Sequence, residues 1–327
     1  MSKSIESGDI YFFYRPKVDF DKIRGMGDVQ RFHLVMVPDK ATKARLFVVG
    51  KKRLPEVAEG RAQSTEREWM MNSMTAKPGD VGKALGPVTY DTSTEGEQVQ
   101  GEAIPAGEGR YAIFERKGDT RLAYRLFRPR KPGNAQKALG ILPEATFIVS
   151  VKNPTLGGPG FPQEKPEYPK KLREMFGDKR WIDLNDTRLL EYENAQLLLI
   201  GAHASLEQTD IEISGQPDVF ATLGIEPREW ATETVEEGRF TEPKMEAPAI
   251  EPRGDPTKGG KKAAKSDSAA GIAAALKGME FPANRSDLVR HAKEQRAGED
   301  IVSALNGLPS HKFKTMADVQ KALSKVR

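Results

Sequence analysis

The chain has 327 residues, of which 38% are hydrophobic and 30% are charged, so it has room for about two folded domains and enough apolar residues to form their cores. It contains no cysteine, which excludes disulfides, cysteine nucleophiles, cysteine-ligated zinc and iron–sulfur clusters. Neither the first residues nor any later run has the apolar length of a signal peptide or of a membrane-spanning helix. We therefore expect a cytoplasmic protein that does not enter a membrane.

The positive charge is concentrated toward the C-terminus. Residues 258–327 hold 14 Lys and Arg against 7 Asp and Glu, a net charge of +7, while the rest of the chain holds 37 against 40, a net charge of −3. A positive surplus on one segment attracts polyanions such as nucleic acid, although the same surplus also serves solubility.

Apolar runs of strand length recur through the first two thirds of the chain. Residues 10–14 read IYFFY, and their consecutive aromatic residues predict a strand covered on both faces. Residues 31–37 and 45–49 flank a polar turn and predict a hairpin. Further strands are expected at residues 146–151, 196–200 and, more weakly, 210–214.

The clearest local signal is a hairpin over residues 110–127, in which two apolar runs flank the turn sequence KGDT. Alternation along the first strand puts apolar side chains on both of its faces. On the second strand, Leu122, Tyr124 and Leu126 form one apolar row, and Arg121 and Arg125 lie on the opposite face.

Short helices are expected between the strands. Residues 65–75 and 168–176 have the apolar spacing of helices packed on a sheet. Residues 77–86 read KPGDVGKALG and residues 131–140 read KPGNAQKALG, so each has an Asp or Asn able to cap a helix and a glycine able to end it. A looser version covers residues 218–224. Either the same start and stop chemistry produced similar strings, or the domain is internally duplicated.

These patterns give the fold class and domain limits. Seven or eight strands with short helices predict a strand-rich α+β domain over residues 1–229, although the strand count alone also fits a sandwich, a barrel or a bent sheet. Residues 230–268 are rich in Pro, Gly, Ala and Lys and predict a flexible linker. Residues 269–327 have four apolar stripes with matching caps and predict a small bundle of four helices. Asn284 or Ser286 is the expected cap of the second of these helices.

A family resemblance rests on the C-terminal sequence. Residues 275–309, followed by residues 312–323, resemble a small bacterial family known as domain of unknown function 2795. The likeness is carried by Leu276, Phe281, Pro282, Leu288, His291, Ala292, Leu305, Leu308, Pro309, Phe313, Asp318 and Val319. It implies a bacterial source and a compact helical fold, and it transfers no catalytic residue.

The sequence shows no clear catalytic or metal-binding pattern. The four histidines, His33, His203, His291 and His311, lack the paired spacing of metal ligands. The acidic cluster of Asp183, Asp186, Glu191 and Glu193 could gather a hard cation, but Arg188 interrupts it, and a solvated, helix-capping segment is the preferred interpretation. No phosphate-binding glycine loop and no nucleophile elbow is present. We expect no metal and no cofactor, and an enzyme is the least favoured class.

The favoured hypothesis is a non-enzymatic binding protein whose basic C-terminal module contacts nucleic acid through phosphates. The candidate contact residues are Lys258, Lys261, Lys262, Lys265, Arg285, Arg290, Lys293, Lys312 and Lys314. A second basic patch is formed by Arg121, Arg125, Arg128, Arg130 and Lys131, but a solvated sheet face balanced by Glu115 and Asp119 is its preferred interpretation. The alternative is a protein–protein adaptor in which the helical module docks on a partner protein. The sequence does not indicate an oligomeric state.

Overall fold

The structure is a computed structural model, and the chain divides mainly into an N-terminal and a C-terminal compact unit. Over the first 248 residues it describes residues 2–17, 23–57, 66–92, 96–157, 162–207 and 209–241. In the C-terminal unit it describes residues 276, 279, 282–294, 302, 305–309, 312–313, 318–319 and 322.

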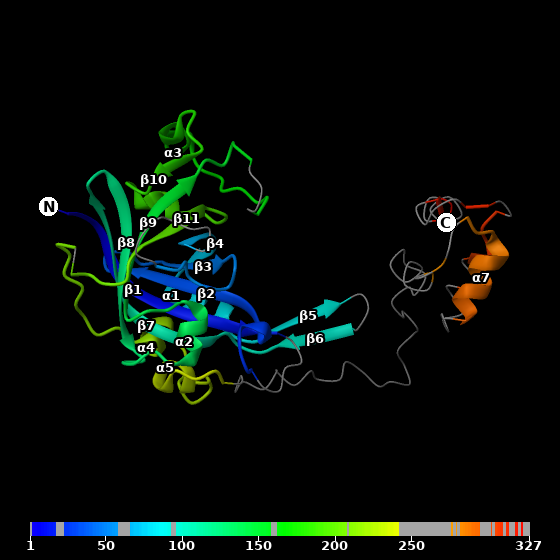
Figure 1. Ribbon diagram of the computed structural model, residues 1–327, viewed down its shortest axis with the longest axis horizontal. Coiled ribbons are helices and arrows are strands. Elements are labelled where there is room, and N and C mark those ends of the chain that lie inside the picture. The colour runs from blue at the N-terminus through cyan, green and yellow to red at the C-terminus, as the bar shows by residue number, and fades with distance from the viewer. Residues whose placement is uncertain are drawn as a thin grey trace. The chain divides into compact units, whose positions relative to one another are not determined.

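Eight antiparallel strands form a closed barrel in the N-terminal unit (Figure 1). They are β1 (Lys3–Pro16), β2 (Val29–Pro38), β3 (Ala44–Val49), β4 (Arg67–Ala76), β7 (Ile104–Arg116), β8 (Asp119–Arg128), β9 (Glu144–Lys152) and β11 (Gln196–His203). The order around the barrel is β9-β11-β4-β3-β2-β1-β7-β8, and β8 pairs with β9 to close it. Every barrel strand therefore has a partner on both sides, which removes the exposed sheet edges of an open sheet.

The remaining strands and helices are short. Strand β10 (Trp181–Asp183) extends the sheet along β9, and β5 (Val88–Thr92) pairs with β6 (Gly96–Gln100) in a separate two-stranded sheet. The helices of this unit are α1 (Pro78–Leu85), α2 (Asn134–Leu139), α3 (Lys170–Arg173), α4 (Val219–Leu223) and α5 (Glu233–Glu237), with 3-10 turns η1 (Met26–Asp28), η3 (Glu174–Phe176) and η4 (Thr187–Glu191).

The predicted α+β class is wrong, because the N-terminal unit is a closed antiparallel barrel and its few helices only cover it. Part of the error comes from residues 65–75, which the sequence predicts to be a helix. In the structure, most of this segment belongs to strand β4. Trp69, Met70 and Met74 have helical spacing, yet β4 pairs with β3 on one side and β11 on the other. The hairpin over residues 31–37 and 45–49 and the hairpin of β7 and β8 form as predicted. Residues 210–214 do not form a strand.

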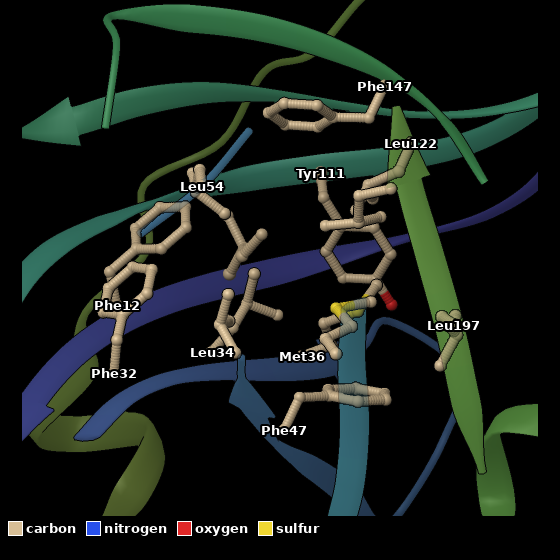
Figure 2. Packing of buried hydrophobic residues seen from close by; sticks show 14 of the residues in the cluster. Phe12, Phe32, Leu34, Met36, Phe47, Leu54, Tyr111, Leu122, Phe147 and Leu197 are labelled. Carbon is tan, nitrogen blue, oxygen red and sulfur yellow. The ribbon is translucent and has the colours of Figure 1, made fainter. Parts of the chain in front are cut away.

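Large apolar side chains fill the barrel interior (Figure 2). Phe12 lies 6.3 Å from Phe32 and 5.1 Å from Tyr124, measured between ring centroids. Tyr124 in turn stacks on Phe147 of β9 at 6.2 Å. All four rings are almost fully buried, so the interior is a packed core of the kind that small barrels have.

Apolar residues from the connections join this core beyond each end of the barrel. Tyr168, Phe176 and Leu189 belong to the segment that precedes β11, and they bury against the interior cluster. Leu139 and Ile141, which precede β9, join the same cluster from the opposite end, together with Leu54. Both ends of the core are thus covered by the chain itself.

Part of the outer surface is covered as well. Tyr11 and Phe13 of β1 pack outward against a second cluster that includes residues of α1, α4 and α5. Ala112 and Phe114 of β7 pack outward against Leu206 and Ile213. These contacts confirm the prediction that both strands are covered on two faces, and they explain why the two strands are apolar at consecutive positions.

The repeated strings do not end their helices alike. In α1 neither Asp80 nor the closing Gly86 behaves as expected, since no side chain caps the start and Gly86 has a negative φ of −62°. In α2 the Gln136 side chain accepts from the Gly133 amide, and Gly140 is left-handed with φ 74°. Only α4 has both features, with Asp218 as the cap and Gly224 left-handed.

The N-terminal unit continues into the segment that was predicted to be linker. Trp230 and Val235 are buried in the outer cluster, and α5 follows residue 232. Tyr14 donates to the backbone oxygen of Thr241 at 3.1 Å. The rest of the predicted linker, residues 242–268, lies outside the described residues.

In the C-terminal unit the structure describes one full helix, α7 (Arg285–Glu294) (Figure 1). The buried core of the C-terminal unit, among the described residues, consists of Leu276, Ala283, Leu288, Ala292, Leu305, Leu308, Phe313 and Val319. Most of these are residues that carry the family resemblance, so the shared pattern specifies packing. An isolated antiparallel bridge ties Ala283 to Phe313 through two backbone hydrogen bonds of 3.0 and 2.8 Å.

Candidate nucleic-acid interface

Helix α7 is fixed at its start by a reciprocal capping box. The Asn284 side chain accepts from the Asp287 amide at 3.0 Å, and the Asp287 carboxylate accepts from the Asn284 amide at 3.2 Å. Two orphan amides are thereby satisfied, and the negative carboxylate lies at the helix end that favours it. Of the two predicted caps, Asn284 is the one that acts.

The buried face of α7 determines which residues face outward. Leu288 and Ala292, one helical turn apart, are fully buried. Arg290 and Lys293 therefore lie on the exposed side of the helix, whereas Arg285, three and seven positions before the two apolar residues, lies beside the buried stripe.

Three of the predicted contact residues line one shallow groove beside α7. The groove has a volume of about 590 Å³ and is lined by Arg285, Ser286, Val289, Arg290, Lys293 and Asn306. Five of these residues are at helical positions i, i+1, i+4, i+5 and i+8, which form one face of a helix. The lining residues that the structure describes include three cations and no carboxylate.

The two arginines of the groove are held differently. Arg285 donates through Nη1 to the backbone oxygen of Leu308 at 3.1 Å, which ties the start of α7 to the segment that carries Asn306. Arg290 donates through Nη2 to Asp287 at 2.9 Å, but its side chain is 69% exposed. An exposed ion pair contributes at most about 1 kcal/mol, so Arg290 is able to exchange this partner for a phosphate.

The remaining predicted contacts are not gathered at this groove. Lys312 is exposed and is not among the lining residues. Lys258, Lys261, Lys262, Lys265 and Lys314 lie outside the described residues. Ser286, Val289 and Asn306 were not predicted as site residues, and only the helical spacing of Ser286 and Val289 relative to Arg285 could have indicated two of them.

The second basic patch is largely neutralised by nearby carboxylates. Arg125 donates to Glu144 at 2.7 Å and to the backbone oxygen of Ile213 at 3.1 Å. Arg128 donates to the buried Glu108, and this hydrogen bond raises the pKa of the guanidinium. Arg121 lies 3.8 Å from Asp119 and is mostly buried. The last two residues, Arg130 and Lys131, are exposed.

The predicted acidic cluster is dispersed by other contacts. Asp186 caps η4 and accepts from Arg188, which lowers the pKa of the carboxyl group. Glu191 accepts from the buried Arg45. Within the described residues, no group of three or more His, Asp and Glu side chains is arranged to hold a metal ion.

Comparison with known proteins recognises the C-terminal region. Residues 267–320 match the family model described as "Protein of unknown function (DUF2795)", which confirms the resemblance found in the sequence. No curated protein and no solved structure matches the chain. Among the described residues, no helix is long and apolar enough to cross a membrane.

Proposed function

We propose that the protein binds nucleic acid through phosphates and that the groove beside α7 is a contact surface. The observation that carries this proposal is the placement of Arg285, Arg290 and Lys293 along one shallow groove, whose described lining residues include no carboxylate. Guanidinium and ammonium groups are the usual partners of backbone phosphates, and they need no base contact to bind them.

The contrast with the second basic patch supports the choice of site. Arg125 and Arg128 each donate to a carboxylate of the barrel, so a phosphate would have to displace an existing ion pair there. Of the groove cations, Arg285 donates to a backbone oxygen, and Arg290, which is itself exposed, donates to the half-buried Asp287. Binding at the groove therefore has the smaller cost in lost interactions. A nucleic-acid ligand also agrees with the cytoplasmic location that the sequence predicts.

The direct test removes the three groove charges in the full-length protein. The variant R285Q/R290Q/K293Q is compared with K170Q/K171Q/R173Q, which removes three exposed cations from α3. Fluorescence anisotropy with labelled DNA is expected to show a loss of affinity of at least about ten-fold for the groove variant at 50 mM salt and little change for the control.

The salt dependence of the wild type decides between charge-driven and other binding. Affinity is expected to fall steeply with salt, because each neutralised phosphate releases counterions. An affinity that is insensitive to salt, or an equal loss in both triple variants, would contradict the proposal. A partner protein captured from lysate after nuclease treatment, and retained by the groove variant, would instead support the adaptor hypothesis.

A further inference from the structure

We infer that Asp287 restrains the phosphate affinity of the groove beside α7, because its carboxylate competes with the ligand for Arg290. The inference rests on the proposed function and concerns how tightly that same site binds. It is carried by the hydrogen bonds of one carboxylate, which lies in the first turn of the helix that bears the groove cations.

The carboxylate of Asp287 serves two partners at once. Its Oδ2 accepts from the Asn284 amide at 3.2 Å, which is one half of the capping box of α7. Its Oδ1 accepts from Nη2 of Arg290, three positions further along the helix, at 2.9 Å. Because the cap fixes the carboxylate at the helix start, Arg290 is drawn to an acceptor that is already held in place.

The two arginines of the groove differ in how their charge is compensated. Arg285 donates to the backbone oxygen of Leu308 at 3.1 Å, and an uncharged acceptor leaves the positive charge of the guanidinium in place. Arg290 donates to a carboxylate, which offsets its charge. A phosphate that takes Arg290 must therefore displace Asp287 or share the guanidinium with a second anion.

The expected size of this restraint follows from the exposure of the pair. The side chain of Arg290 is 69% exposed and that of Asp287 is 32% exposed. Exposed ion pairs at this helical spacing are weak, so the loss of this one is expected to change affinity by about two- to five-fold. Asp287 thus moderates binding at the groove and does not prevent it.

The test replaces Asp287 in the full-length protein. The variant D287N removes the charge but keeps a side-chain oxygen that can accept from the Asn284 amide, so the cap is retained. The anisotropy assay with labelled DNA is expected to show an affinity about two- to five-fold higher than that of the wild type. The control D80N breaks a similar pair in α1, where Lys83 lies 3.6 Å from Asp80, and is expected to leave the affinity unchanged.

A double-mutant cycle shows whether Asp287 acts through Arg290. In the background R290Q, the addition of D287N is expected to change the affinity by less than about 1.5-fold, because the competing partner has been removed. The variant D287E keeps the charge at a position where Glu also completes a capping box, and it is expected to bind as the wild type does. Amide hydrogen exchange along α7 checks that D287N leaves the helix as protected as in the wild type.

The outcomes separate the role of Asp287 from the proposed function. If D287N bound no more tightly than the wild type while R285Q/R290Q/K293Q lost affinity, the role of Asp287 would be overturned and nucleic-acid binding would stand. A gain that was equally large in the R290Q background would mean that the carboxylate repels the ligand directly, and competition for Arg290 would be ruled out. If neither the wild type nor D287N bound DNA, both proposals would be removed.

Discussion

At the scale of single residues, His33 is the clearest violation of ordinary burial rules in the described barrel. It lies on β2 between Phe13 of β1 and Val48 of β3. Both ring nitrogens are buried and have no hydrogen-bond partner. Burial, reinforced by the charges of Arg15 and Arg31, lowers the pKa of His33 to about 3. The folded protein therefore holds this imidazole in its neutral form at neutral pH.

This burial predicts a loss of stability in mild acid. The unfolded chain binds a proton at His33 below about pH 6.5, whereas the folded chain does not do so until about pH 3, so stability falls as the pH falls between these values. The expected slope from this residue is about 1.4 kcal/mol per pH unit. The variant His33→Leu should lose that part of the slope and gain about 1–3 kcal/mol at pH 7, because two unsatisfied buried nitrogens are removed.

Urea unfolding of the wild type and the variant between pH 7 and pH 5 measures both effects. His203→Gln is the control, since it removes a histidine of β11 that is half-buried. Parallel pH profiles for the wild type and His33→Leu would show that His33 does not control the acid response.

At the scale of elements, α7 shows how one cap is selected among two sequence candidates. Asn284 and Ser286 both precede the apolar residues of the helix, but only Asn284 exchanges hydrogen bonds with Asp287. Asn284→Ala is expected to destabilise the C-terminal unit by about 1 kcal/mol, and Ser286→Ala by much less, because the loss of a capping side chain leaves an amide unsatisfied. Amide hydrogen exchange along α7 in the full-length protein measures this difference. Equal protection in the two variants would contradict the assignment of the cap.

Local sequence patterns predict some of the strands and helices and fail for others. The hairpin of β7 and β8 was predictable because its turn and its alternation agree over many residues. Strand β4 was not, because Trp69, Met70 and Met74 fit a helical stripe and the strand pairing of β4 is contributed by distant segments. Long-range pairing overrode local spacing there. In the candidate site, the cations of α7 were predictable from charge, whereas Asn306 is brought beside them by packing alone.

At the scale of the whole molecule, the decisive feature is the closure of the barrel between β8 and β9. The pairing joins Leu122 to Phe147 and Tyr124 to Ala145. A pattern of alternating residues predicts that strands form, but it does not predict the long-range pairings that closure also needs, such as β1 with β7 and β11 with β4. For that reason the strand count from the sequence was close to the observed number while the predicted fold class was wrong.

Tyr124 connects this closure to the packed interior. Its ring lies against Phe12 of β1 and Phe147 of β9, and its hydroxyl oxygen accepts from the Leu142 amide at 2.9 Å. Tyr124→Ala is expected to cost about 3–5 kcal/mol, because it removes a large buried side chain from a filled core. Tyr124→Phe should cost only about 1 kcal/mol, since it removes the hydroxyl and keeps the ring contacts.

The pairing of β8 with β9 also determines which amides should exchange faster in the Tyr124→Ala variant. Because β8 and β9 protect each other's amides, Tyr124→Ala should accelerate hydrogen exchange over residues 121–125 and 144–148 more than over the pairing of β2 with β3. Urea unfolding gives the size of the loss, and exchange measured by residue gives its location. If the amides of residues 121–125 that point toward β9 exchanged as fast as those of an unpaired edge in the wild type, β8 and β9 would not be paired in solution and the barrel would be open at this seam.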